Sequence, residues 1–337
     1  MPTSANPTKA PGAAQAFVQW VDSRQQGLGK LDSDSAAKYA SIWNVWVQAL
    51  PADTPWHRAS TQDVETWLRE VRPSASARRN RASLSEGRAS PVTQRRYWRV
   101  LRDVYAHAVD QQWAAENPCE QKMAVPRSEA MASMVLTPRM LDQVHQALVQ
   151  DGAGQSWQAA RDRCMKLLLL ATAAKTGEIV QLRSDQVWSM AVGGASAYTV
   201  ELQRAEPAES TRRIVVDDPG AVAAITAWRK TRQQVPGHPE WLFFSAKREN
   251  ALRGDLRKPL TAKSVFTSCA ATLEACLPPE TLQVMLAHAG AECLRNSVIA
   301  RWLATGMDIS QVLHLSGLKD PRSLARLLSL MKGRAAA

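Results

Sequence analysis

The sequence predicts a mainly helical protein with a small antiparallel β-sheet, an α+β fold divided between two domains. Three observations lead to this prediction. Apolar residues recur at helical spacing over most of the chain, and one pair of short segments alternates apolar and polar residues as a β-hairpin does. The chain has 337 residues, enough for two domains that each bury a core.

The first domain is expected over residues 15–121, after a disordered lead at residues 1–14 that lacks the apolar segment of a signal peptide. Its tryptophans fall mostly on apolar stripes and are therefore expected in the core, not in base stacking. Asn117-Pro118 ends its last helix, because a residue before proline is biased out of the helical region. The predicted helices cover residues 14–26, 35–50, 61–71 and 93–113.

A polar linker is expected at residues 122–136, and the second domain at residues 137–337. Thr137-Pro138 opens its first helix with a cap residue followed by proline at the first helical position. Residues 196–204 and 212–217 form the predicted hairpin, and residues 246–259 form a basic loop. The remaining helices are predicted at 137–150, 156–175, from 219 onward, 261–276, 279–287, 290–305, 308–316 and 320–332.

The charge balance favours a polyanionic partner. Lys and Arg number 42 against 31 acidic residues, which gives a net charge of +11 and a pI near 9.7. Double-stranded DNA is the expected partner. A membrane is not, because no apolar run approaches the roughly 20 residues that span a bilayer. The five scattered cysteines suit buried packing in a reducing, cytoplasmic setting, and neither a metal nor another cofactor is expected.

The most basic tract joins the third and fourth predicted helices. Residues 72–99 contain eight arginines and a single acid, Glu86. A solvated loop is one interpretation of such a tract, but its arginines are almost unopposed and continue to Arg102. Because guanidinium groups pair well with phosphate oxygens, we expect contact with the DNA backbone. The eight are Arg72, Arg78, Arg79, Arg81, Arg88, Arg95, Arg96 and Arg99.

Several stretches of the second domain resemble the tyrosine recombinases, or phage integrases, and the resemblance covers roughly residues 15–332. It implies a helical core-binding (SAM-like) domain followed by a catalytic-like domain. An apolar helix leading into Lys175-Thr-Gly-Glu and then Leu-Arg-Ser-Asp resembles the first conserved box of the family. The stretches that resemble its later segments are residues 241–245, 260–265, 292–306 and 309–317.

The resemblance implies a cleavage site that has lost most of its chemistry. The family uses a tyrosine nucleophile, two arginines, a lysine and histidines. Here Arg295 retains the second arginine, whereas Lys175 replaces the first and Arg204 falls near the lysine position. The two histidines of the second box become Glu292 and Asn296. The later histidine or tryptophan becomes Leu318, and the tyrosine becomes Leu327.

These substitutions predict a non-catalytic protein that clamps duplex DNA between two basic domains. Its expected role is that of a regulator or accessory factor in recombination, transposition or plasmid maintenance, associated with a prokaryotic nucleoid or encoded by a mobile element. The arginine tract supplies one side of the clamp. The other side is predicted to comprise Lys175, Arg204, Arg212, Arg213, Lys247, Arg248, Lys263 and Arg295.

Alternatives remain open at this point. One is an active recombinase with a displaced nucleophile or a tyrosine supplied by a partner recombinase; another is a helical protein that binds an acidic protein. The apolar helix at 320–332 either docks on a neighbouring subunit or folds back on its own domain. Arg295 either contacts DNA or pairs with Glu292 three residues earlier, and we expect the pair.

Overall fold

The chain divides into two compact units, residues 1–130 and 131–337, with a boundary inside the predicted linker. Most of the predicted linker at residues 122–136 lies outside the described residues, which resume at Val135. The computed structural model describes residues 10–26, 31, 33–72, 88–89, 91–120, 135–151, 156–203, 211–248, 257–285, 289–318, 320–325 and 327–328.

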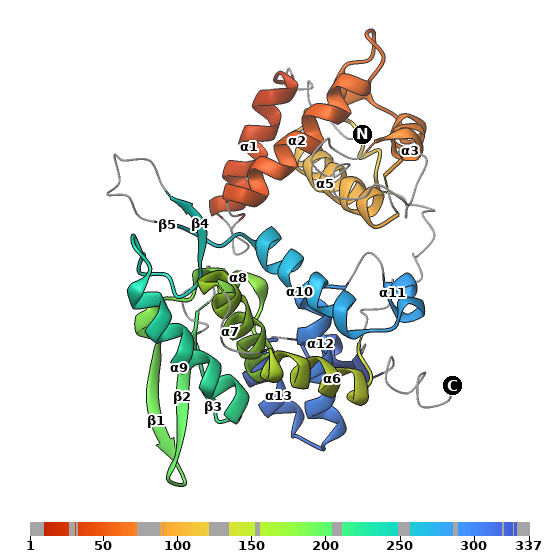
Figure 1. Ribbon diagram of the computed structural model, residues 1–337. Helices are drawn as coiled ribbons and strands as arrows, with labels where there is room; N and C mark the ends of the chain where they lie inside the picture. The colour runs from red at the N-terminus through yellow and green to blue at the C-terminus, as the bar shows by residue number, and fades with distance from the viewer. Residues whose placement is uncertain are drawn as a thin grey trace. The chain divides into compact units, whose positions relative to one another are not determined.

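In the described residues of the first unit, four α-helices lie close to their predicted positions (Figure 1). The first begins at Ala13, inside the predicted disordered lead. The third begins at a capping box, in which the Ser60 hydroxyl accepts from the main-chain N–H of Asp63 and the Asp63 carboxylate accepts from that of Ser60. The helices are α1 (Ala13–Gln26), α2 (Ser33–Ala49), α3 (Thr61–Glu70) and α5 (Pro91–Asp110).

Aromatic side chains fill the core of this unit. The indole N–H of Trp46 donates to the Tyr105 hydroxyl at 3.1 Å, and that hydroxyl donates to the carbonyl of Trp56 at 2.6 Å. Trp43 is fully buried against Trp56 and Tyr105. These tryptophans are thus core residues, and each polar end that they bury has a hydrogen-bond partner.

The second unit is also mainly helical, and the predicted α+β fold class is confirmed. Most of its helices lie within a few residues of the predicted ranges. They are α6 (Pro138–Gln150), α7 (Trp157–Thr172), α8 (Thr176–Gln181), α9 (Pro219–Gln234), α10 (Ala262–Cys276), α11 (Pro279–Met285), α12 (Ala291–Ala304) and α13 (Ile309–Ser316).

A three-stranded antiparallel sheet of order β1-β2-β3 lies beside these helices (Figure 1). The predicted hairpin is the pair β2 (Ala195–Leu202) and β3 (Arg212–Val216). Strand β1 (Val187–Val192) was not predicted, because only Val187 is buried and its sequence lacks the alternation of a half-buried strand. The predicted basic loop contains a second, two-stranded sheet of β4 (Phe244–Arg248) and β5 (Arg257–Pro259).

The predicted helix at 156–175 is broken before Lys175. Helix α7 ends at Thr172, and Ala173 adopts a left-handed conformation with φ +48°. The Thr172 hydroxyl donates to the carbonyl of Leu168 and accepts from the main-chain N–H of Ala174, which stabilises the break. Lys175 therefore occupies the N-cap position of the separate helix α8.

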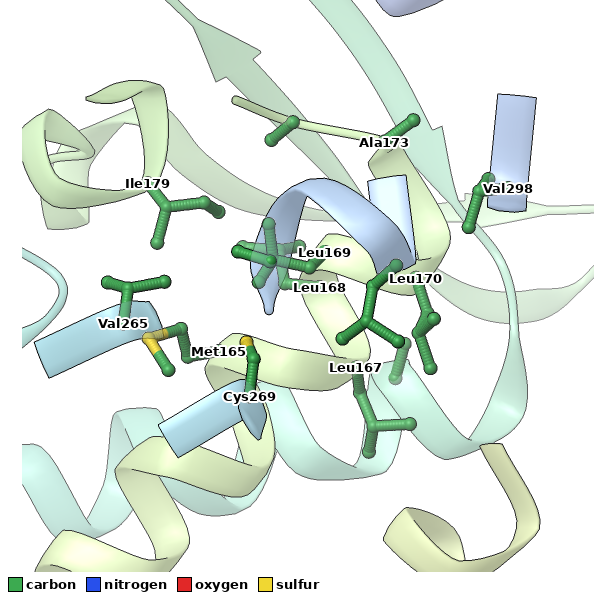
Figure 2. Close-up of a cluster of buried hydrophobic side chains, with 14 of the residues drawn as sticks. Met165, Leu167, Leu168, Leu169, Leu170, Ala173, Ile179, Val265, Cys269 and Val298 are labelled. Carbon is green, nitrogen blue, oxygen red and sulfur yellow. The ribbon is translucent and has the colours of Figure 1, made fainter. Parts of the chain in front are cut away.

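Helix α7 lies at the centre of the core of the second unit. Figure 2 shows its leucines surrounded by Ile179 from α8, Val265 and Cys269 from α10, and Val298 from α12. Burial raises the pKa of the Cys269 thiol to about 12, so this cysteine is a packed apolar residue and not a reactive thiol. Four of the five cysteines are buried in this way.

The C-terminal segment folds back on its own unit. Residues 322–325 are helical, and Leu324 and Leu327 are 1% and 3% exposed within the same core cluster. The side of the segment that carries these two leucines is therefore occupied within the chain. No helix in the described ranges combines the length and the apolar composition required to cross a bilayer.

Candidate functional site: a buried basic cluster and an exposed arginine surface

An ion pair between Glu178 and Arg212 lies at the centre of the candidate site. The two side chains are 3% and 4% exposed, and both nitrogens at the end of the guanidinium donate to the carboxylate, Nη2 to Oε2 at 2.7 Å. The main-chain N–H of Lys175 also donates to Glu178 Oε2, at 2.7 Å. Three donors thus satisfy a carboxylate that would otherwise be costly to bury.

The electrostatics of Glu178 follow from these contacts. Burial alone would raise the pKa of its carboxyl group. The hydrogen bonds and positive charge of Arg212, together with the amide and charge of Lys175, outweigh burial and hold that pKa below its ordinary value. Glu178 is therefore ionised near neutral pH and fixes Arg212 in place.

Two arginines bind the end of helix α13. Arg212 Nε donates to the carbonyl oxygen of Leu315 at 2.8 Å, and Arg295 Nη2 donates to that of Ser316 at 2.9 Å. Arg295 Nε also donates to the carbonyl of Ala173 at 2.9 Å, next to the break after α7. A helix leaves its last carbonyls without intrahelical partners, and here arginine side chains supply them.

The residue after α13 must be glycine for this arrangement to form. Gly317 adopts φ +63°, a left-handed conformation that other residues rarely accept. A Cβ atom there would also lie only 2.6 Å from Nη1 of Arg212. Gly317 therefore allows the buried guanidinium to approach the backbone closely.

The arginine tract of the first unit is partly described. Arg72, Arg88, Arg96 and Arg99 are exposed, and Arg95 is half-buried. Arg96 and Arg99 lie on α5, where the Arg96 guanidinium stands 5.7 Å from the ring centroid of Tyr39. Arg78, Arg79 and Arg81 lie outside the described residues.

The other predicted contacts of the second unit lie in varied settings. Lys247 and Lys263 are exposed, and Lys175 is half-buried. Arg213 is exposed, forms an ion pair with Glu201 and stacks over Trp188. Arg204 and the side chain of Arg248 lie outside the described residues.

A scan against protein-family models gives no match, and a search of curated proteins gives none either. Solved structures do match. The XerH site-specific recombinase, bound to palindromic difH substrate in a post-cleavage complex, has a TM-score of 0.65 at 14% identity, over 97% of this chain and 83% of its own. The Tn1549 transposon integrase, in complex with transposon right end DNA, has a TM-score of 0.63 at 14% identity, over 97% of this chain and 100% of its own. A lambda integrase dimer bound to a COC' core site has a TM-score of 0.58 at 13% identity, over 95% and 77%.

The chain has the fold of the tyrosine recombinases. This confirms the resemblance that the local stretches of sequence indicated. At such low identity the likeness shows the fold alone. The role of each residue aligned with the tyrosine-recombinase site is therefore judged from its own contacts and burial.

Two positions differ from the prediction. Arg212 was placed in the DNA-facing set, but it is 4% exposed and held by Glu178 and the Leu315 carbonyl, so that assignment is wrong. Arg295 does not form the expected pair with Glu292. Arg295 is 8% exposed and donates to main-chain carbonyls, whereas Glu292 is exposed at the start of α12.

Three other residues that the resemblance placed in the site are buried or partly buried. Leu327, which the resemblance aligned with the tyrosine, is buried in the core, and Leu318 packs partly buried against that core. Asn296 is 7% exposed on α12. No cluster of three or more His, Cys, Asp or Glu residues that would hold a metal ion occurs in the described part of the chain.

Sequence reasoning missed the role of Glu178. The signal was present, because a glutamate three residues after the N-cap of a helix commonly accepts from the N-cap amide, as Glu178 does from Lys175. The partner Arg212 lies 34 residues away on a strand, and no local pattern connects the two.

Proposed function

We propose that this protein is a non-catalytic double-stranded DNA-binding protein on the tyrosine-recombinase scaffold. It would act as a regulator or accessory factor of recombination, transposition or mobile-element maintenance. One observation carries the non-catalytic part: Leu327, which the resemblance aligns with the nucleophile, is 3% exposed in the core. An alkyl side chain cannot attack a phosphodiester, and a buried one does not reach DNA.

The cluster around Arg212 and Arg295 supports the same proposal. Transesterification requires donors preorganised toward the oxygens of the phosphate. Here Arg212 donates to Glu178 and Leu315, and Arg295 donates to Ala173 and Ser316. These contacts aim both guanidinium groups at the protein's own backbone and carboxylate.

The four tyrosines of the chain are poor substitutes for a nucleophile. Tyr105 is buried and its hydroxyl contacts Trp46 and Trp56. Tyr198 is 8% exposed and hydrogen-bonded to Thr226. Tyr97 stacks on Trp67 in the first unit, and burial raises the pKa of its phenol. The fourth, Tyr39, packs partly buried against the core of the same unit.

The DNA-binding part rests on charge. The net charge is +11, and Arg72, Arg88, Arg96 and Arg99 are all exposed. The XerH, Tn1549 and lambda integrase structures are all DNA complexes, which supports the same partner for this fold.

The test begins with selection of bound duplexes from a genomic DNA pool. The recovered site is then presented as a suicide substrate, nicked so that strand cleavage traps a covalent protein–DNA adduct. We expect stable binding without an adduct. An adduct would contradict the non-catalytic proposal, and its loss in one Tyr→Phe variant would identify the nucleophile.

The salt dependence of binding tests the DNA part separately. Each phosphate contact adds about 0.9 to the slope of log K against log salt concentration. We expect a steep slope for duplex DNA. Failure to bind duplex DNA at low salt, with the fold intact, would contradict the proposal and favour an acidic protein partner.

A further inference from the structure

Strand β1 is an edge strand that is covered only near its start, where the Val187 carbonyl accepts from Nη1 of Arg229 on α9. Over the rest of its described residues it lacks the features that usually protect an edge. The sheet order places β2 on one side of β1 and no described strand on the other. Its sequence, Val-Trp-Ser-Met-Ala-Val, has no charge and no proline, and all six residues pair with β2 in one uninterrupted register. Proteins commonly protect exposed edges with charged residues, proline or bulges, because an open edge accepts a further strand. The opposite edge strand, β3, contains two arginines.

Apolar side chains dominate the outer face of the same sheet along β1, although the Arg213 guanidinium, paired with Glu201, also stands over Trp188 there. Trp188, Met190 and Val192 alternate along β1 and are 38%, 38% and 41% exposed. Val215 of β3, 48% exposed, lies on that face too, because Thr199 of β2 is paired with both Trp188 and Val215. These four are among the nine large apolar side chains that are exposed in the described residues, so the sheet concentrates exposed apolar surface.

We propose that β1 pairs with β1 of a second copy of this chain. Two identical edges pair antiparallel about a two-fold axis, which joins the sheets of both copies and continues the apolar face across the junction. Trp188, Met190 and Val192 of one copy then lie beside the same residues of the other. The strand has no charged side chain, and the Arg213 guanidinium that stands over Trp188 is paired with Glu201, so the pairing brings no unpaired like charges together, despite the net positive charge of the chain.

The contact is expected to be weak in free solution. Six residues on each edge bury less than the roughly 800 Å² per partner that is usual for a stable interface. Two copies held on one duplex have a high effective concentration for each other, which would turn a weak contact into cooperative DNA binding. The cooperative DNA binding rests on the proposed function. The strand pairing does not, and the pairing is tested without DNA.

Cysteine cross-linking tests the pairing directly. Single cysteines replace each of residues 188–192 in turn, in a Cys276→Ser background, because Cys276 is half-buried and the other native cysteines are buried. We expect disulfide-linked dimers under mild oxidation, strongest at the position nearest the two-fold axis. A cysteine at Ile309, 50% exposed on α13, is the matched control and should give little dimer.

Sedimentation over a wide concentration range gives the second measurement. The native chain should show reversible monomer–dimer association, and Met190→Lys or Ser189→Lys should weaken it at least about tenfold. Ile309→Lys should leave it unchanged, and circular dichroism checks each fold. A monomer at all concentrations, or cross-linking no stronger than at Ile309, would overturn the proposal. The alternative would then be that β1 pairs with an extended segment of another protein. A dimer that both lysine variants leave intact would overturn it as well.

Discussion

Arg212 and Arg295 donate to the carbonyl oxygens of two consecutive residues, Leu315 and Ser316, in the last turn of α13. The end of a helix has a partial negative charge and unpaired carbonyls, so it is a favourable partner for cations. The two arginines come from β3 and α12 and therefore fix three elements against one another. These two buried cations therefore hold elements of the second unit together.

The first prediction concerns the Glu178–Arg212 pair. Removing one partner, by Glu178→Ala or Arg212→Met, should lower the free energy of unfolding by about 3–5 kcal/mol, because the other charge remains buried without its counterion. The double variant Glu178→Leu/Arg212→Met should lose less than the two single losses combined. Chemical denaturation of the three variants measures the coupling. Additive losses would contradict a direct pair.

The second prediction concerns pH. The folded pKa of Glu178 lies below its ordinary value of 4.5, so the unfolded chain binds its proton more readily than the folded one. The pair therefore stabilises fully above about pH 4.5, and this contribution is lost as pH falls through the folded pKa. The stability difference between the native chain and Glu178→Ala should narrow in that range. Asp308 and Asp320, whose pKa values are also lowered by hydrogen bonds, titrate in both proteins and cancel.

The third prediction separates structure from DNA contact at Arg295. Arg295→Met keeps the volume but removes donors to two buried carbonyls, so we expect a loss of about 2–4 kcal/mol of stability. The salt slope of DNA binding should stay unchanged, because Arg295 is 8% exposed and its guanidinium donates to main-chain carbonyls of the protein, so it should not displace counterions from DNA. DNA binding of the native chain and of the variant is measured below the melting temperature of the variant, so that both proteins are folded when their salt slopes are compared. A slope lowered by about one unit would mean that Arg295 does contact phosphate.

The fourth prediction is that restoring the nucleophile alone will not restore cleavage. Leu327→Tyr introduces a larger, polar side chain at a core position, which should cost about 1–3 kcal/mol of stability. No covalent adduct should form on a suicide substrate, because Arg212 and Arg295 remain bound to the protein itself. An adduct with Leu327→Tyr would show that the rest of the site is still competent.

The fifth prediction concerns the exposed surface of α5. Replacing Arg96 and Arg99 together by alanine should lower the salt slope of DNA binding by roughly 2 units if both contact phosphate. Arg69→Ala, an equally exposed helical arginine on α3, is the matched control. The same measurement applied to Arg78, Arg79 and Arg81 should lower the slope by roughly 2–3 units. Unchanged slopes would assign the tract to a solvated surface.

Local pattern in the sequence determined most of the helices and the hairpin. The stripe of Val64, Trp67 and Leu68 and the cap at Thr137 each depend on residues within a few positions of one another, so the chain itself specifies them. The resemblance also predicts, from residue type alone, that Leu318 and Leu327 replace catalytic residues of the family. Strand β1 was not predicted because nearly all of its side chains are exposed. Apolar and polar residues alternate along a strand only when one of its faces is buried.

Only the tertiary structure decided which cations face outward. Arg212 and Arg213 are neighbours in the sequence, yet one is buried against Glu178 and the other is exposed, because adjacent residues of a strand point to opposite faces of the sheet. Arg295 donates hydrogen bonds to carbonyls of two segments that are distant in the sequence, and not to Glu292 on its own helix. Such contacts join residues between 21 and 122 positions apart, and their energies depend on burial, which folding creates.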